Sequence, residues 1–66
     1  MKLIVYVGSS WRVYEIHKPT TKEKAAKALV KEYAELGREV TAIFTIFKSK
    51  RGHEAVGTIV YGGLNA

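Results

Sequence analysis

The sequence contains no cysteine, which excludes disulfide bonds, cysteine-based zinc sites and thiol chemistry, and leaves the redox compartment open. It also has no aspartate, no glutamine and a single asparagine, and methionine occurs only at position 1. The longest apolar runs, 3–7 and 42–47, are too short to span a membrane, and no small-residue cleavage site follows the first of them. We therefore expect a cytoplasmic protein without membrane contact.

The chain of 66 residues is 47% hydrophobic and carries a net charge of +5. A body of this size hides only about 60% of the surface of its extended chain, so the margin of stability is thin. This predicts one domain over 1–61 with a flexible tail over 62–66, helped by self-association, and excludes a two-domain enzyme. Lysine and glutamate carry most of the charge, a bias of hyperthermophile proteins that chance or design also produces.

The first part of the chain predicts a β-hairpin. Residues 2–7 alternate as a strand, 8–10 form a turn, and 11–17 are rich in aromatic and β-branched side chains. The facing of the second strand stays open, because one alternation turns Glu15 inward and the other turns Arg12 inward.

A helix is predicted next, and its limits are marked by specific residues. Pro19 ends the preceding strand, and Thr20 with Glu23 fits a capping box. The helix is expected to run to about Leu36, where Gly37 supplies a left-handed stop. Its apolar stripe, at helical spacing, consists of Ala25, Ala26, Leu29, Val30, Tyr33 and Leu36.

Two further strands are predicted over 38–48 and 54–61, joined by a basic turn, with Gly57 weakening the last one. The fold class is therefore α+β: a strand-strand-helix-strand-strand order in which one helix covers one face of a four-stranded sheet. This order is similar to the β-grasp architecture of ubiquitin-like and immunoglobulin-binding domains, a resemblance in topology alone. A sheet completed by the strands of two copies fits the pattern equally well.

One helix leaves the other face of the sheet uncovered. We expect the helix to cover Leu3, Val5, Val7, Val40, Ala42, Phe44 and Ile46. The open face would carry Ile4, Tyr6, Thr41, Ile43, Thr45 and Phe47, which is more apolar than a solvated sheet face. Three occupants remain open: a second copy, nucleobases stacked on aromatic side chains such as Tyr6 and Phe47 with Trp11 or Tyr14, and another protein.

Basic residues gather in two places. Lys18, Lys22, Lys24 and Lys27 surround the predicted helix start, and Lys48, Lys50 and Arg51 lie in the last turn. Lysines at a helix start oppose the helix dipole, which suggests an anion site there. The alternative is a solvated helix face with ion pairs at i,i+4 spacing, and a turn whose lysines discourage aggregation.

Catalysis is not expected. His17 and His53 are the only histidines and have no second ligand at a metal-binding spacing, so we expect neither metal nor cofactor. Gly62 and Gly63 resemble the terminal diglycine of ubiquitin-like carriers, but three residues follow them. A glycine pair that opens a loose tail is the simpler interpretation.

The sequence therefore predicts a small non-enzymatic binding module that contacts nucleic acid through Lys18, Lys22, Lys24, Lys48, Lys50 and Arg51. The alternative is a protein-interaction module, of phage, viral or archaeal type, that uses Ile4, Tyr6, Ile43, Thr45 and Phe47 for homodimerisation or for binding a host protein. A ubiquitin-like carrier and a designed or orphan scaffold are lesser alternatives.

Overall fold

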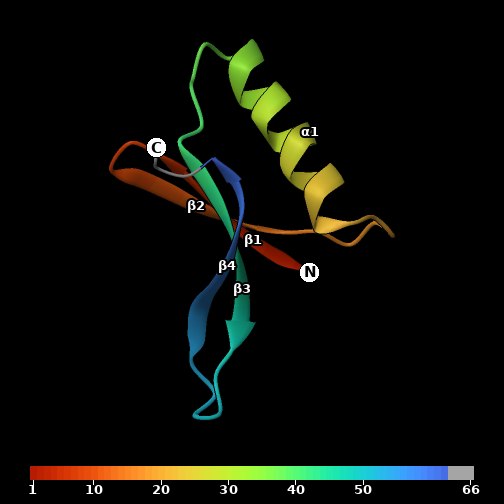
Figure 1. The fold of residues 1–66 in the computed structure, drawn as a ribbon, viewed down its shortest axis with the longest axis vertical. Coiled ribbons are helices and arrows are strands. Elements are labelled where there is room, and N and C mark those ends of the chain that lie inside the picture. The colour runs from red at the N-terminus through yellow and green to blue at the C-terminus, as the bar shows by residue number, and fades with distance from the viewer. Residues whose placement is uncertain (63–66) are drawn as a thin grey trace.

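A computed structural model describes residues 1–62 as one four-stranded sheet with a helix on one face (Figure 1). The elements follow in the order β1 (Lys2–Val7), β2 (Ser10–Glu15), α1 (Lys22–Glu35), β3 (Ala42–Lys48) and β4 (Glu54–Gly62). The predicted α+β class and element order are confirmed. Gly62, predicted as the first residue of the tail, belongs to β4, and the rest of the predicted tail, including Gly63, lies outside the described residues.

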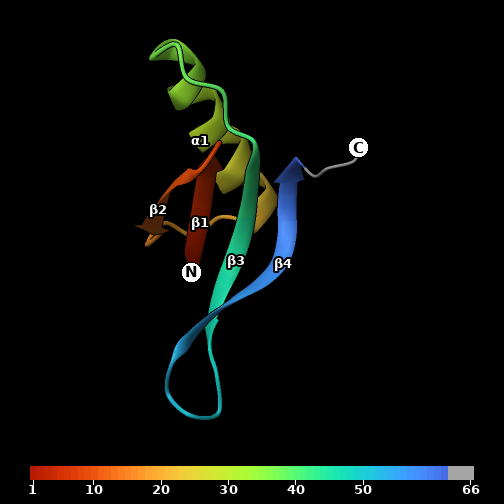
Figure 2. The same ribbon diagram turned by 90° about the vertical axis from the view of Figure 1, so that its left-hand side faces the viewer.

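The sheet has the strand order β2-β1-β3-β4, and its three pairings are antiparallel (Figure 2). Since β1 is antiparallel to both of its neighbours, β2 and β3 run in the same direction with β1 between them. The helix connects these two strands. The pairing continues past the strand ends, where the Ile16 amide donates to the Met1 carbonyl at 2.7 Å and the Thr41 amide donates to the Tyr6 carbonyl at 2.8 Å.

Two strand limits differ from the prediction. The second strand ends at Glu15 rather than at 17, and the third begins at Ala42 rather than at 38. Residues 38–41 connect the helix to the sheet, although Val40 is buried as expected. An apolar side chain at a loop position looks the same in sequence as the first inward residue of a strand.

The facing of β3 is the reverse of the predicted one. Val5 pairs with Ile43, and Leu3 pairs with Thr45, so these side chains share a face. Ile43 is 0% exposed and belongs to the core beneath the helix. The expectation that Ile43, Thr45 and Phe47 lie on the open face is therefore wrong, as is the inward placement of Ala42, Phe44 and Ile46. Both sets of alternate residues in β3 are apolar, so the alternation along the strand could not decide which set faces the helix.

The core lies between the helix and one face of the sheet. Its buried members are Leu3, Val5, Ala25, Ala26, Leu29, Tyr33, Val40 and Ile43. The helical members recur at intervals of three and four residues, which places them on one side of α1. The inward placement of β1 and of the helix stripe was predicted correctly, apart from Leu36, which is 75% exposed.

The helix begins one residue later than its predicted cap. Thr21 is the N-cap, and its hydroxyl accepts a hydrogen bond from the Lys24 amide at 3.2 Å. The predicted capping box of Thr20 and Glu23 does not form, because the cap lies one residue further along and Lys24, not Glu23, occupies the third helical position. Thr20 instead donates to the Thr21 carbonyl at 3.5 Å.

The helix ends as predicted at a left-handed glycine. Gly37 has a φ of 74° and donates to the Ala34 carbonyl at 2.9 Å. The next amide, that of Arg38, donates to the Tyr33 carbonyl at 2.9 Å. These two bonds form a Schellman motif, which satisfies the last carbonyls and turns the chain back over the helix end.

Replacing Gly37 tests this helix end. A Cβ at Gly37 meets no atom within 4 Å, so the cost of Gly37→Ala comes from backbone conformation alone. We expect Gly37→Ala to lower the free energy of unfolding by about 1 kcal/mol. Gly37→Asn, which tolerates the left-handed region, should lose less. Urea unfolding measures both, and equal stability of all three proteins would contradict a left-handed helix end.

Candidate functional site

The far end of β3 and β4 forms a two-stranded ribbon that leaves the sheet. Pairing of β1 with β3 stops at Ile46, whereas Phe47 and Lys48 still pair with Ala55 and Glu54 of β4. The ribbon therefore consists of 47–55 and projects beyond the other strands (Figure 2). Its turn is closed by the Ser49 amide, which donates to the His53 carbonyl at 2.7 Å, and by the Gly52 amide, which donates to the Ser49 carbonyl at 2.9 Å.

The ribbon carries three of the predicted nucleic-acid-binding residues. Lys48, Lys50 and Arg51 all lie in it, and their side chains are exposed. The turn supports them through its own backbone bonds, so three positive charges sit close together at one extremity of the molecule (Figure 1).

The helix start lies at the same end of the sheet as the base of the ribbon. Lys2 pairs with Glu15 near the end of β2 and with Ile46 near the end of β3, so both strands finish at this end. The chain that follows β2 carries exposed Lys18, Lys22 and Lys24. The structure thus brings the two predicted basic groups to one end of the sheet, with the ribbon extending away from it.

The six basic residues of these two groups have no carboxylate within 4.0 Å in the described part of the chain. The two ion pairs found among residues 1–62 join the Met1 amino group to Glu15 at 3.5 Å and Lys2 to Glu54. The hydrogen bond with Glu54 raises the pKa of Lys2 above 10.5. The i,i+4 pairs predicted on the helix are not formed either, and none of Lys18, Lys22, Lys24, Lys48, Lys50 and Arg51 is neutralised by an ion pair within the described residues.

The uncovered face of the sheet is apolar. Its apolar members, identified from the pairing register, are Ile4, Tyr6, Trp11, Val13, Phe44, Ile46, Val56 and Ile59, and the same register places Lys2, Glu15, Lys48 and Glu54 on this face at the end where the ribbon begins. Tyr6 and Phe44 meet edge to face with ring centroids 5.8 Å apart, and Trp11 pairs with Tyr6 on the neighbouring strand. Trp11 is 63% exposed, and Val56 and Ile59 are each 48% exposed. We call this set the open face.

An uncovered face rich in apolar side chains was predicted, but several of the residues on it differ from the predicted ones. Ile4 and Tyr6 lie on it as expected, whereas Ile43 and Thr45 lie on the opposite face with the core. Phe47 is 51% exposed and, by alternation, points to the helix side of the sheet, in the ribbon beyond the core. The members that were not assigned come mostly from β2 and β4, whose facing the sequence left open.

A second feature that sequence reasoning missed is a row of two arginines and two tyrosines. The Tyr14 and Tyr33 hydroxyls share a hydrogen bond of 2.6 Å. Arg12 lies 5.9 Å from the centroid of the Tyr14 ring, and Arg38 lies 5.9 Å from that of Tyr33. These residues come from β2, α1 and the segment after the helix, so only the folded chain brings them together.

Tyr14 titrates at higher pH than an ordinary tyrosine. Partial burial, the hydrogen bond with Tyr33 and the charge of Tyr33 raise the pKa of Tyr14 above 10.0, and Glu32 acts in the same direction. The Arg12 charge opposes this shift. Tyr14 is therefore neutral at physiological pH and keeps its hydroxyl proton.

The two histidines stand apart from any such cluster. Among residues 1–62 no group of three or more histidine and acidic side chains is close enough to hold a metal ion. In the same part of the chain no helix is long and apolar enough to cross a membrane. The residues that the structure does gather are basic or aromatic, which suits binding of anions and of flat or apolar groups.

No protein-family model, no curated protein and no solved structure matches this chain. The surfaces described above therefore carry the functional argument by themselves.

Removing the Tyr14 hydroxyl tests the tyrosine pair. Tyr14→Phe should lower the free energy of unfolding at neutral pH by about 1 kcal/mol, the net value of a hydrogen bond. Because the folded state raises the pKa of Tyr14, its share of stability is complete below pH 10.0 and falls as the pH rises further. As the pH rises above 10.0, the free energy of unfolding should therefore fall less in Tyr14→Phe than in the parent.

Urea unfolding at neutral pH and at about pH 9 to 11 measures both effects. The matched control is Tyr61→Phe, whose hydroxyl makes no hydrogen bond within the described residues and which should change stability by under about 0.5 kcal/mol. An equal loss in the two variants at neutral pH would contradict a stabilising Tyr14–Tyr33 bond.

Proposed function

We propose that this protein is a non-enzymatic module that binds double-stranded DNA, with the ribbon 47–55 in the major groove. The observation that carries the proposal is the basic ribbon that continues past the last pairing of β1. The major groove of B-form DNA is about 12 Å wide and admits a two-stranded ribbon, whose strands lie about 4.8 Å apart. The major groove of an A-form RNA helix is too narrow for it, which favours DNA.

The helix-start lysines complete the proposed contact. Lys18, Lys22 and Lys24 lie at the end of the sheet from which the ribbon extends, and they face no carboxylate within 4.0 Å in the described residues. A duplex that holds the ribbon tip in its groove has phosphates on either side of that groove. Contacts of these lysines with phosphates would set orientation and affinity without reading sequence. The net charge of +5 favours the same partner.

Neutralising one ribbon charge tests this proposal. Arg51→Gln should reduce the slope of log K against log salt by about one, since each phosphate contact contributes about 0.9 to that slope. Fluorescence anisotropy with a labelled DNA duplex, at several salt concentrations, measures the slope. The matched control is Lys31→Gln, a neutralised exposed residue of α1 outside both basic groups. Identical slopes for Arg51→Gln, Lys31→Gln and the parent would contradict the proposal.

A second candidate function, self-association, is favoured by the open face. No helix or strand of the described chain covers this face, and about half or more of the surface of Trp11, Val56 and Ile59 is exposed on it. With Tyr6, Val13 and Phe44 they leave on the order of 500 Å² of apolar surface, since an aromatic side chain alone can bury 150–250 Å². Two copies packed face to face would bury about 1,000 Å², the lower limit of a specific interface.

A charge placed in the open face tests self-association. Ile59→Lys should turn a dimer into a monomer, because the ammonium group would lose its hydration on packing against a second copy. Light scattering coupled to size-exclusion chromatography, over a range of concentrations, measures the mass. The matched control is Leu36→Lys, at a position 75% exposed but outside the open face. A mass for Ile59→Lys that equals the parent's would rule out this interface.

A further inference from the structure

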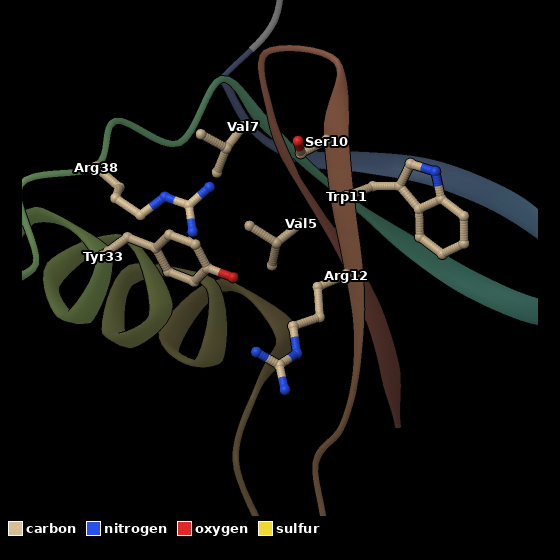
Figure 3. A pocket seen from close by; sticks show the side chains of 7 residues that line it. All are labelled: Val5, Val7, Ser10, Trp11, Arg12, Tyr33 and Arg38. Atoms are coloured by element: carbon tan, nitrogen blue, oxygen red, sulfur yellow. The ribbon is translucent and has the colours of Figure 1, made fainter.

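A small hollow opens between the β1–β2 hairpin and the end of the helix (Figure 3). It has a volume of about 130 Å³ and is lined by Val5, Val7, Ser10, Arg12, Tyr33 and Arg38, together with Trp11. The Trp11 ring points away to the other side of the sheet, whereas the Arg38 guanidinium lies beside the Tyr33 ring and that of Arg12 lies on the other side of the Tyr33 hydroxyl. Two positive charges thus border a space of small-molecule size.

Both arginines are exposed, and each lies against a tyrosine ring without a side-chain hydrogen bond to the described residues. Each guanidinium lies 5.9 Å from a tyrosine ring centroid, Arg12 at Tyr14 and Arg38 at Tyr33. Within the described residues neither side chain lies within 4.0 Å of a carboxylate. A guanidinium has five N–H donors in a fixed planar fork, which matches the oxygens of a carboxylate or a phosphate. These donors remain available here.

The backbone fixes the position of Arg38. Its amide closes the Schellman motif by donating to the Tyr33 carbonyl at 2.9 Å, so its side chain starts directly beside Tyr33. Arg12 is fixed by its strand, since it pairs with Val5 on the face that the helix covers. The backbone positions from which the two charges reach the hollow are therefore fixed by the helix end and by the β1–β2 pairing.

We propose that this hollow binds one phosphate group, with Arg12 and Arg38 as the charged ligands. Two guanidinium groups can each form paired hydrogen bonds with phosphate oxygens, and these are among the strongest contacts available to a protein side chain. The Ser10 hydroxyl adds a further donor at the rim. Val5 and Val7 line the inner wall of the hollow. A phosphate group fits this volume, and the rest of a larger molecule would lie outside the hollow.

This site is separate from the proposed DNA contact. It lies where Val7 pairs with Ser10, at the end of the sheet opposite to Lys2 and the base of the ribbon. The phosphate could belong to a small molecule or to a nucleic-acid backbone that reaches this end. The chemistry of recognition is the same in both cases, so the experiment separates the sources.

The test is an NMR titration of the full chain with inorganic phosphate, followed through its backbone amides and arginine side-chain N–H signals. We expect saturable shifts at Ser10, Arg12 and Arg38. Arg12→Gln and Arg38→Gln should each weaken binding at least tenfold, and Arg38→Lys should recover part of it, because an ammonium keeps the charge but loses the planar fork. The matched control is Lys31→Gln, which removes one exposed charge outside both proposed contacts and should bind phosphate as the parent does.

The second arm titrates the same variants, together with Arg51→Gln, with a DNA duplex. Arginine-dependent binding of free phosphate, with unchanged duplex affinity in Arg38→Gln, assigns the site to small phosphate compounds. Loss of duplex affinity in Arg38→Gln without binding of free phosphate assigns it to a backbone phosphate. Shifts spread evenly over all basic residues, or an equal effect of Lys31→Gln in the phosphate titration, would overturn the site. If only Arg51→Gln loses affinity for the duplex, the ribbon contacts DNA and the phosphate site does not. The two proposals can therefore fail independently.

Discussion

The register between β1 and β3 is the constraint on which the rest of the structure depends. Once Val5 is opposite Ile43, every side chain of β3 is assigned to a face, because successive residues of a strand point to opposite sides. Ile43 then joins Leu3, Val5 and the helix in the core, and Phe44 joins Tyr6 on the open face. A shift of one residue would exchange the two sets, and the core would lose its most buried β3 side chain.

The same register also determines where the sheet stops. Because β1 is short and its pairing with β3 ends at Ile46, the remaining residues of β3 and β4 have only each other as partners. The ribbon 47–55 is thus a consequence of unequal strand lengths. Two register shifts in the β3–β4 pairing accompany it, and Gly57 lies at this irregularity, where an added Cβ would collide with the Thr45 hydroxyl. Bulges of this kind increase the local twist, which turns the ribbon relative to the sheet.

Sequence reasoning succeeded where one local signal decided the outcome. The helix has a single apolar stripe and a glycine at its end, and both were predicted correctly. It failed for β3, since Ala42, Phe44 and Ile46 are as apolar as the set that includes Ile43, and only the partner strand distinguishes them. It also missed Arg12 and Arg38, which are 26 positions apart in the chain and lie against a hydrogen-bonded pair of tyrosines, one on the same strand as Arg12 and one on the helix. The clustering of the basic residues could be predicted without knowledge of the fold, because charges that are close in sequence remain close in a turn.

Self-association through the open face would have a consequence for the proposed DNA contact. The ribbon is a direct continuation of β3 and β4, so its direction is fixed relative to the open face that those strands help to form. Two copies packed through the same patch are related by a two-fold axis. Their ribbons would then be related by that axis as well, and a duplex that accepts both would carry two inverted half-sites, which is the arrangement that symmetric DNA-binding dimers recognise. The angle between the two packed sheets would then set the spacing of the half-sites. Self-association and DNA binding would therefore depend on the same angle.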